Sequence, residues 1–168
     1  VSVSLPLTKK TEHIRAFKQA RRREDDIAIV TSCLRVELLS AEESLRAAEE
    51  KAKEEHTKLE QSRAKAADSN SASASSCSSP IVKDVSLGFG GMWKTPVRAR
   101  KTEEFLRGKA WNESTIKLAV EMLGKDFPLD KSTPGGMPEF RKTLCASFLF
   151  KFFVHSTQQQ AARAQKAG

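Results

Sequence analysis

The sequence predicts an α+β fold in which a small antiparallel β-sheet packs on a three-helix layer, with a long helical and disordered insertion in a hairpin. Short segments of residues 1–39 and 81–87 are rich in Val and Ile or alternate apolar with polar residues. From residue 95 onward, apolar residues instead recur every three or four positions. A run of strands followed by a run of helices is typical of a two-layer α+β sandwich.

Four strands are expected in this chain. Residues 1–7 alternate apolar and polar side chains, as a half-buried strand does, and residues 13–18 form a second short candidate. Residues 27–39 are rich in Ile and Val and predict a third strand. Residues 81–87 predict a fourth, which we expect to pair with the third as an antiparallel hairpin.

The segment between the third and fourth strands is interpreted as an insertion at the hairpin tip, where extra length costs little. Residues 40–66 begin Ser-Ala-Glu-Glu, a suitable helix start, and continue in Ala, Glu, Lys, Leu and Arg. This pattern favours a charged, solvated helix over a short coiled coil. Residues 67–80 are almost all Ser, Ala and Asn, which is typical of a disordered linker.

Three helices are expected after the fourth strand. Pro96 is suited to a helix start and Gly108 to its end, and residues 112–124 place apolar side chains on one face. Pro138 opens the third helix, whose core stripe consists of Phe140, Leu144, Phe148 and Phe152. We therefore expect one domain over residues 1–156, interrupted by 40–80, and a tail or frayed helix end over residues 157–168.

The charge of the chain is +8, but it is unevenly distributed. Residues 1–36 carry eight Lys and Arg against four Asp and Glu, residues 37–80 carry six against nine, and residues 81–168 carry fifteen against eight. A basic balance can indicate nucleic-acid binding. Here most cations alternate with acids and few aromatic residues accompany them, so we expect no nucleic-acid partner.

The composition also bears on location and chemistry. No stretch approaches the roughly 18 apolar residues of a membrane span, so no membrane association is expected. Cys33, Cys77 and Cys145 are odd in number and far apart, which favours a reducing, cytoplasmic compartment. Neither Cys nor His has metal-ligand spacing, and no nucleophile is paired with a base, so we expect no metal site and no catalytic residue.

Two stretches raise the possibility of a ligand. The glycine-rich run at residues 88–91 lies between a strand and a helix, where backbone N–H groups can face an anion. It lacks the rest of a dinucleotide or P-loop motif, so tight turns with positive φ are favoured here and at residues 134–136. Residues 17–30 join three arginines to three acids before an apolar run. They are either a solvated ion-pair cluster or a charged loop beside a cofactor.

Five motifs in order resemble the C-terminal part of the FAD domain of the xanthine dehydrogenase/oxidase family of molybdenum hydroxylases. They are Phe-Lys-Gln-Ala-x-Arg-Arg-Glu-Asp-Asp-Ile-Ala-x-Val at 17–30, Arg-Val at 35–36, Gly-Gly-Met at 90–92, Lys-Thr-Glu to Trp at 101–111 and Pro-Gly-Gly-Met to Phe at 134–152. Aldehyde oxidases share the later motifs but lack the Arg-Arg-Glu-Asp-Asp run. The CO dehydrogenase flavoprotein C-terminal domain is the corresponding domain type.

The resemblance implies that the chain helps to hold FAD, with Lys18 against the flavin. It also implies a flavin-side loop whose residues are Gln19, Arg22, Arg23, Asp25 and Asp26. In this family electrons pass from molybdopterin through two [2Fe–2S] clusters to FAD, and then to NAD or oxygen. Loop charges beside a partly desolvated flavin would alter the potential there. The parent enzyme implied is a homodimer, and the other domains of that enzyme are the implied partners.

This chain departs from the family in several ways. Cys33 stands where Gly is usual, Trp93 where a small residue is common, and Arg21 adds a cation to the loop. The chain lacks the molybdopterin domain, the iron–sulfur cysteines and the FAD pyrophosphate loop. We therefore expect a fragment that is inactive in purine hydroxylation alone and that holds FAD weakly or not at all. The alternatives are a non-catalytic interaction module that uses helix 40–66, or a flavoprotein piece of an aldehyde oxidase or CO dehydrogenase-like enzyme.

Overall fold

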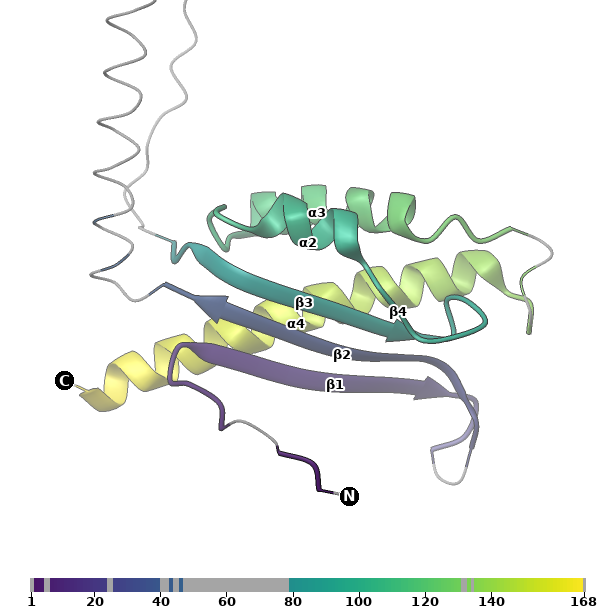
Figure 1. The fold of residues 1–168 in the computed structure, drawn as a ribbon, viewed down its shortest axis with the longest axis horizontal. Helices are drawn as coiled ribbons and strands as arrows, with labels where there is room; N and C mark the ends of the chain where they lie inside the picture. The colour runs from purple at the N-terminus through teal and green to yellow at the C-terminus, as the bar shows by residue number, and fades with distance from the viewer. Residues whose placement is uncertain are drawn as a thin grey trace, which may run out of the picture.

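The computed structural model describes residues 2–4, 7–23, 26–39, 43, 46, 79–130, 133 and 135–167. These residues form a four-stranded antiparallel sheet and three helices, so the predicted α+β fold is confirmed (Figure 1). The sheet order is β1-β2-β3-β4, which is also the order along the chain. The elements are β1 Glu12–Ala20, β2 Ala28–Leu38, β3 Val82–Gly90, β4 Val97–Arg98, α2 Arg100–Leu106, α3 Glu113–Asp126 and α4 Pro138–Ala167.

Strands β2 and β3 form the expected antiparallel hairpin around the insertion. The backbone N–H of Leu39 donates to the carbonyl of Ile81 over 2.8 Å, so the two strands meet where the insertion leaves the sheet. Glu43 and Arg46 are helical, and the rest of residues 40–78 lies outside the described part of the chain. The predicted helix at 40–66 and the linker at 67–80 are therefore described only at these two residues and at residues 79–80.

The two faces of the sheet are different because side chains alternate along each strand. Val30, Leu34 and Val36 of β2 are fully buried on the face that the helices cover. Figure 1 shows α4 running behind the strands, with α2 and α3 beyond β3. On the opposite face, Cys33 and Ile14 are exposed. This second face is called the open face below.

The segment of residues 1–7 is not a strand in its described part, which corrects the first strand prediction. Residues 2–4 and 7 have no regular structure, and the side chains of Val3 and Leu7 are 81% and 95% exposed. Within the described residues, β1 is the outer strand of the sheet and pairs with β2 alone. An alternating pattern stabilises a strand only when a neighbour pairs with it and one face is covered, and residues 2–4 and 7 have neither.

Helix α2 begins at Arg100, four residues later than the sequence predicts. Val97 and Arg98 instead form β4, in which Val97 pairs with Phe89 of β3. Residue Ala99, before the helix, provides no side-chain cap. The cap comes from Asp126 at the end of α3, whose carboxylate accepts hydrogen bonds from the backbone N–H groups of Lys101 and Thr102 at 3.0 and 2.9 Å.

Helix α4 is 30 residues long and continues to Ala167, through residues for which the sequence predicts a tail or a frayed helix end. Its far end packs beside the start of β1. Gln159 Oε1 lies 3.0 Å from Nδ1 of the buried His13, and Arg163 donates a hydrogen bond to the carbonyl of Lys10. The helix therefore continues through this segment and contacts the start of β1 at Gln159 and Arg163.

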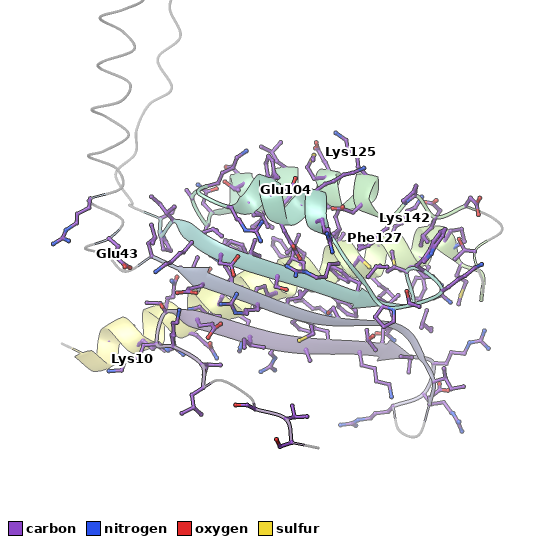
Figure 2. The ribbon with its side chains drawn as sticks, in the orientation of Figure 1. Lys10, Glu43, Glu104, Lys125, Phe127 and Lys142 are labelled. Carbon is purple, nitrogen blue, oxygen red and sulfur yellow. The ribbon has the colours of Figure 1, made fainter. Side chains whose placement is uncertain are left out.

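The core lies between the sheet and the three helices. The ring of Phe127 meets that of Phe89 edge to face, with centroids 5.4 Å apart. Figure 2 shows Phe127 directed inward, whereas Glu104 and Lys125 lie on the outer surface of α2 and α3. The largest fully buried side chains are Val30, Leu34, Val36, Leu38, Val82, Leu87, Phe89, Met92, Leu106, Ile116, Leu149 and Phe152.

Candidate functional site

The predicted loop connects β1 to β2 at the end of the sheet opposite to the insertion. Lys18 and Gln19 lie near the end of β1, just before its last residue Ala20, and both side chains are exposed. The amide of Gln19 donates to the carbonyl of Ala20 over 2.8 Å. The pairing register shifts between Gln19 and Ala20, and Ala20 pairs with Ala28. The structure thus places Lys18 and Gln19 where the chain turns away from the sheet.

Asp26 stabilises this loop through hydrogen bonds to its backbone. Its carboxylate accepts a hydrogen bond of 2.7 Å from the backbone N–H of Arg22 and one of 2.9 Å from the N–H of Ile27. The hydrogen bond from Arg22 lowers the pKa of Asp26, and the bond from Ile27 and the charge of Lys18 act in the same direction. Asp26 is therefore a structural acid within the loop, and its hydrogen bonds stabilise its charged form.

A hollow of about 320 Å³ is lined by residues 18–23. Four of these six residues are cations: Lys18, Arg21, Arg22 and Arg23. The structure therefore brings Lys18, Gln19, Arg22 and Arg23 together, with Asp26 at the loop end, while Asp25 lies outside the described residues. A hollow with this charge attracts an anion or the hydrogen-bond-accepting edge of a neutral ligand.

A shallow shelf on the open face adjoins this hollow. Lys18 pairs with Thr31, which pairs with Gly90, so the three residues form one row across the sheet. The next row begins with Ala16, Cys33 and Gly88, whose side chains are small or absent, and ends at Arg98 of β4. A second hollow of about 330 Å³ lies over Thr31, Cys33, Gly88, Gly90 and Arg98, among other residues.

Together, the shelf and the cationic hollow fit the ring system of a flavin. An isoalloxazine ring is flat, and hydrogen-bond acceptors lie along its pyrimidine edge. The small residues in the middle of these rows leave the surface of the sheet accessible, with Lys18 at one border and Arg98 at the other. Charge beside the ring is one of the means by which a protein tunes flavin chemistry.

The two glycine-rich turns do not form a phosphate site. Gly91, Gly135 and Gly136 have positive φ values of 82°, 80° and 66°, so turns with positive φ are confirmed at these residues, whereas Gly88 and Gly90 belong to β3. The space beside them is occupied by the side chain of Arg141, which donates to the carbonyls of Gly91 and Gly136 at 2.6 and 2.8 Å. These turns therefore present oxygen atoms to an internal cation rather than N–H groups to an anion.

Arg141 is the residue near the site that the sequence reasoning missed. It belongs to the Pro-Gly-Gly-Met to Phe motif, but no role was assigned to it. Besides the two turns, it also donates to the carbonyl of Ile29, at the start of β2, over 2.9 Å. The signal that could have found it is one cation among the apolar residues of the α4 core stripe.

A second charged cluster occupies the other end of the open face. Arg35 pairs with Glu12, with Asp84 at 2.6 Å and with Glu37 at 3.2 Å. The hydrogen bond from Arg35 lowers the pKa of Glu12. Burial raises the pKa of Asp84, but hydrogen bonds from Arg35 and Arg107 outweigh it and leave that pKa below its ordinary value. The cluster is internally paired and joins β1, β2 and β3.

Within the described residues, no group of three or more His, Cys, Asp or Glu is placed to hold a metal ion. In that same part of the chain, no helix has both the length and the apolar character needed to cross a bilayer.

Residues 54–156, more than half of the chain, match the family of CO dehydrogenase flavoprotein C-terminal domains. The chain belongs to this family. Its sequence is similar to xanthine dehydrogenases over almost its whole length: 37% identical to xanthine dehydrogenase 1 of Arabidopsis thaliana over 92% of the chain, and 36% identical to xanthine dehydrogenase/oxidase of Gallus gallus over 95%. It spans only 9% of the length of each of these relatives.

Solved structures share the fold at much lower identity. Quinoline 2-oxidoreductase from Pseudomonas putida 86 matches 88% of the chain with 37% of its own, at a TM-score of 0.54 and 16% identity. Carbon monoxide dehydrogenase from Hydrogenophaga pseudoflava matches 92% of the chain with 40% of its own, at a TM-score of 0.56 and 11% identity. The resemblance to the xanthine dehydrogenase FAD-domain region is thereby confirmed.

Proposed function

We propose that this chain is part of the FAD module of a xanthine dehydrogenase-like oxidoreductase. In this role it helps to hold FAD and shapes the side of the flavin that faces NAD or oxygen. The observation that carries the proposal is the cationic hollow of residues 18–23 beside the flat shelf of the open face. It occurs in a chain that is 37% identical to a xanthine dehydrogenase over 92% of its length.

The residues of the loop have distinct roles in this proposal. Lys18 would contact the flavin, because its row borders the shelf on the open face, and Gln19 would contribute through the cationic hollow that it lines. Arg22, Arg23 and Asp25 would set the potential on the acceptor side. Asp26 would hold the loop in shape through its bonds to the N–H groups of Arg22 and Ile27. FAD, when bound, accepts electrons from the iron–sulfur clusters and passes them to NAD or oxygen.

The rest of the enzyme lies outside this chain in the proposal. The molybdopterin and iron–sulfur centres would belong to other domains of the parent enzyme, which are the partners of this domain in a cytoplasmic homodimer. The two glycine-rich turns direct the carbonyls of Gly91 and Gly136 at Arg141, and the loop that holds the FAD pyrophosphate would belong to another domain of the parent enzyme. The chain alone would therefore bind FAD weakly and would not hydroxylate purines.

A chimeric enzyme tests the proposal directly. This chain would replace the matching segment of the Arabidopsis xanthine dehydrogenase, and the FAD released from the purified enzyme by acid would be quantified by fluorescence. We expect the chimera to retain FAD and Lys18→Ala to lose much of it without loss of fold. Lys117→Ala is the matched control, because Lys117 is an exposed lysine on α3 that pairs with Glu113. A folded chimera without FAD, or equal FAD content in the two variants, would contradict the proposal.

A further inference from the structure

The guanidinium of Arg141 joins three segments that are far apart in the sequence. Nη1 donates to Ile29 O at 2.9 Å and to Gly91 O at 2.6 Å, and Nε donates to Gly136 O at 2.8 Å. The residue is only 8% exposed. Hydrogen bonds from a charged donor are stronger than those between neutral groups, and a buried cation needs them. Arg141 is thus bound by the backbones of β2 and of both glycine-rich turns.

Both turns are shaped to admit this side chain. A Cβ atom at Gly91 would collide with the Ile29 carbonyl and lie 3.1 Å from Nη1 of Arg141. A Cβ at Gly135 would lie 2.6 Å from Nη2. Both glycines also have positive φ. The glycines of two separate motifs therefore serve one purpose, which is to bring main-chain segments close to the Arg141 guanidinium.

Ile29 places this junction at the base of the loop. It follows Ala28, the residue at which the chain returns to pair with Ala20. The carboxylate of Asp26 holds the inner part of the loop, two residues before Ala28. The C-terminal end of the loop, at Ile29, is consequently bound to α4 through Arg141. The N-terminal end of the loop continues directly from β1, which contains Lys18.

We propose that Arg141 is a positioning residue, which fixes the base of the loop of residues 19–28 to helix α4 and thereby sets where the loop stands beside the open face. That this loop faces a flavin rests on the proposed function. The attachment of the loop to α4 does not rest on it. Arg141 acts through the main chain of Ile29 and Gly91, so it need not contact any ligand.

An arginine is needed here because of its planar fork. Nη1 and Nε point in fixed directions and reach carbonyls on different segments, whereas a lysine ammonium has one nitrogen on a flexible stem. Arg141→Lys therefore keeps the charge but loses part of the attachment, and Arg141→Met removes it. Lys142 is the matched control: it is the next residue of α4, and its ammonium contacts only the Glu139 carboxylate in the described structure, at 3.2 Å.

Amide hydrogen exchange on the 168-residue chain without flavin tests the attachment. We expect Arg141→Met to speed exchange at residues 19–31 and 91–93 by about tenfold, as the loss of a charge-assisted hydrogen bond predicts for a local opening. Arg141→Lys should lie between this variant and the wild type, and Lys142→Met should match the wild type. If Arg141→Met does not fold, Arg141→Lys decides the matter by the same comparison.

Two results would overturn the inference. One is an amide exchange rate in the loop of the Arg141 variants that equals the rate in the wild type. The other is faster exchange spread evenly over β3 and the middle of α4, since that would mean a general loss of stability rather than a local attachment. The FAD content of the Lys18→Ala chimera reports on the proposed function separately, so either idea can fail while the other stands.

Discussion

The indole N–H of Trp111 donates a hydrogen bond of 2.9 Å to the hydroxyl of Ser156, and both side chains are buried. Ser156 in turn donates to the carbonyl of Phe153 over 2.9 Å, one turn earlier in α4. The indole also meets the rings of Phe152 and Phe153 edge to face. Trp111, the last residue of one of the five motifs, is therefore a core residue that joins the segment before α3 to α4.

Removing the Ser156 hydroxyl should destabilise the domain. Ser156→Ala leaves the buried Trp111 N–H without its acceptor, so we expect the free energy of unfolding to fall by about 1–3 kcal/mol. Urea denaturation followed by Trp fluorescence measures this. Thr157→Ala is the control, because Thr157 donates to the same Phe153 carbonyl but is exposed. A similar loss in both variants would show that the bond to Trp111 is unimportant.

Substitution of two glycines should have opposite effects. Gly91→Ala places a methyl group against the Ile29 carbonyl at a positive φ, so we expect a loss of at least about 2 kcal/mol. Gly124 lies exposed within α3 with no atom near its missing Cβ. Gly124→Ala should therefore stabilise the domain by about 0.5–1 kcal/mol. Thermal unfolding of both variants measures the difference, and a tolerated Gly91→Ala would mean that Ile29 can move away.

Acid should weaken the domain through the Arg35 cluster. The folded-state pKa values of Glu12 and Asp84 lie below their ordinary values of 4.5 and 3.8. The stability they contribute is therefore complete above those ordinary values and is lost as the pH falls through the lower folded-state values. We expect Arg35→Met to flatten this part of the curve of unfolding free energy against pH.

The control for the acid experiment is Lys117→Met, which removes a surface pair with Glu113 on α3. Exposed pairs contribute little, so its pH curve should follow that of the wild type. If the unfolding free energy of Arg35→Met falls at acid pH as that of the wild type does, other carboxylates cause the loss of stability in acid.

Replacing residues 41–79 with a short turn that contains Gly should leave the domain folded. Leu39 already pairs with Ile81, and the carbonyl of Pro80 accepts a hydrogen bond of 2.8 Å from the backbone N–H of Trp111, so both ends are held without the insertion. The shortened chain should unfold at the same or a higher temperature, because a shorter loop costs less entropy to close. A molten product would show that residues of the insertion stabilise the sheet.

The same shortened chain, placed in the chimeric enzyme, distinguishes a role in FAD binding from a role as an interaction module. Retention of FAD is expected if the domain serves a flavin site. The alternative of an interaction module at residues 40–66 predicts instead that a binding partner is lost. Pull-down with the intact and shortened chains measures this second outcome.

The elements with strong local patterns were predictable from the sequence. The run of Ile and Val at 27–39 became β2. In α4, Phe148 and Phe152 of the predicted stripe are buried and Leu144 is half-buried, but Phe140 is 45% exposed, so the prediction is wrong at that residue. The start of α2 was not predictable, because its cap is Asp126, 25 residues further along the chain, and because Val97 is drawn into a strand by its pairing with Phe89. Both influences act between residues distant in sequence.

The site was predictable only in part. The loop and Lys18 followed from motifs, and the structure added the flat shelf, which depends on which small residues pair across strands. The role of Arg141 could not be predicted from its partners, because they are backbone carbonyls, which every residue has. Only the fold shows which three carbonyls converge on the guanidinium.

Helix α4 holds the β1–β2 hairpin at both of its ends. Near its start, Arg141 binds the backbone at Ile29, and 18 residues later Gln159 lies 3.0 Å from His13. At about 1.5 Å per residue, these two points are about 27 Å apart on one rigid rod. The helix therefore supports the hairpin along its length. A chain truncated before Gln159 would keep the attachment at the β1–β2 loop but lose the one at the end of the hairpin next to the insertion.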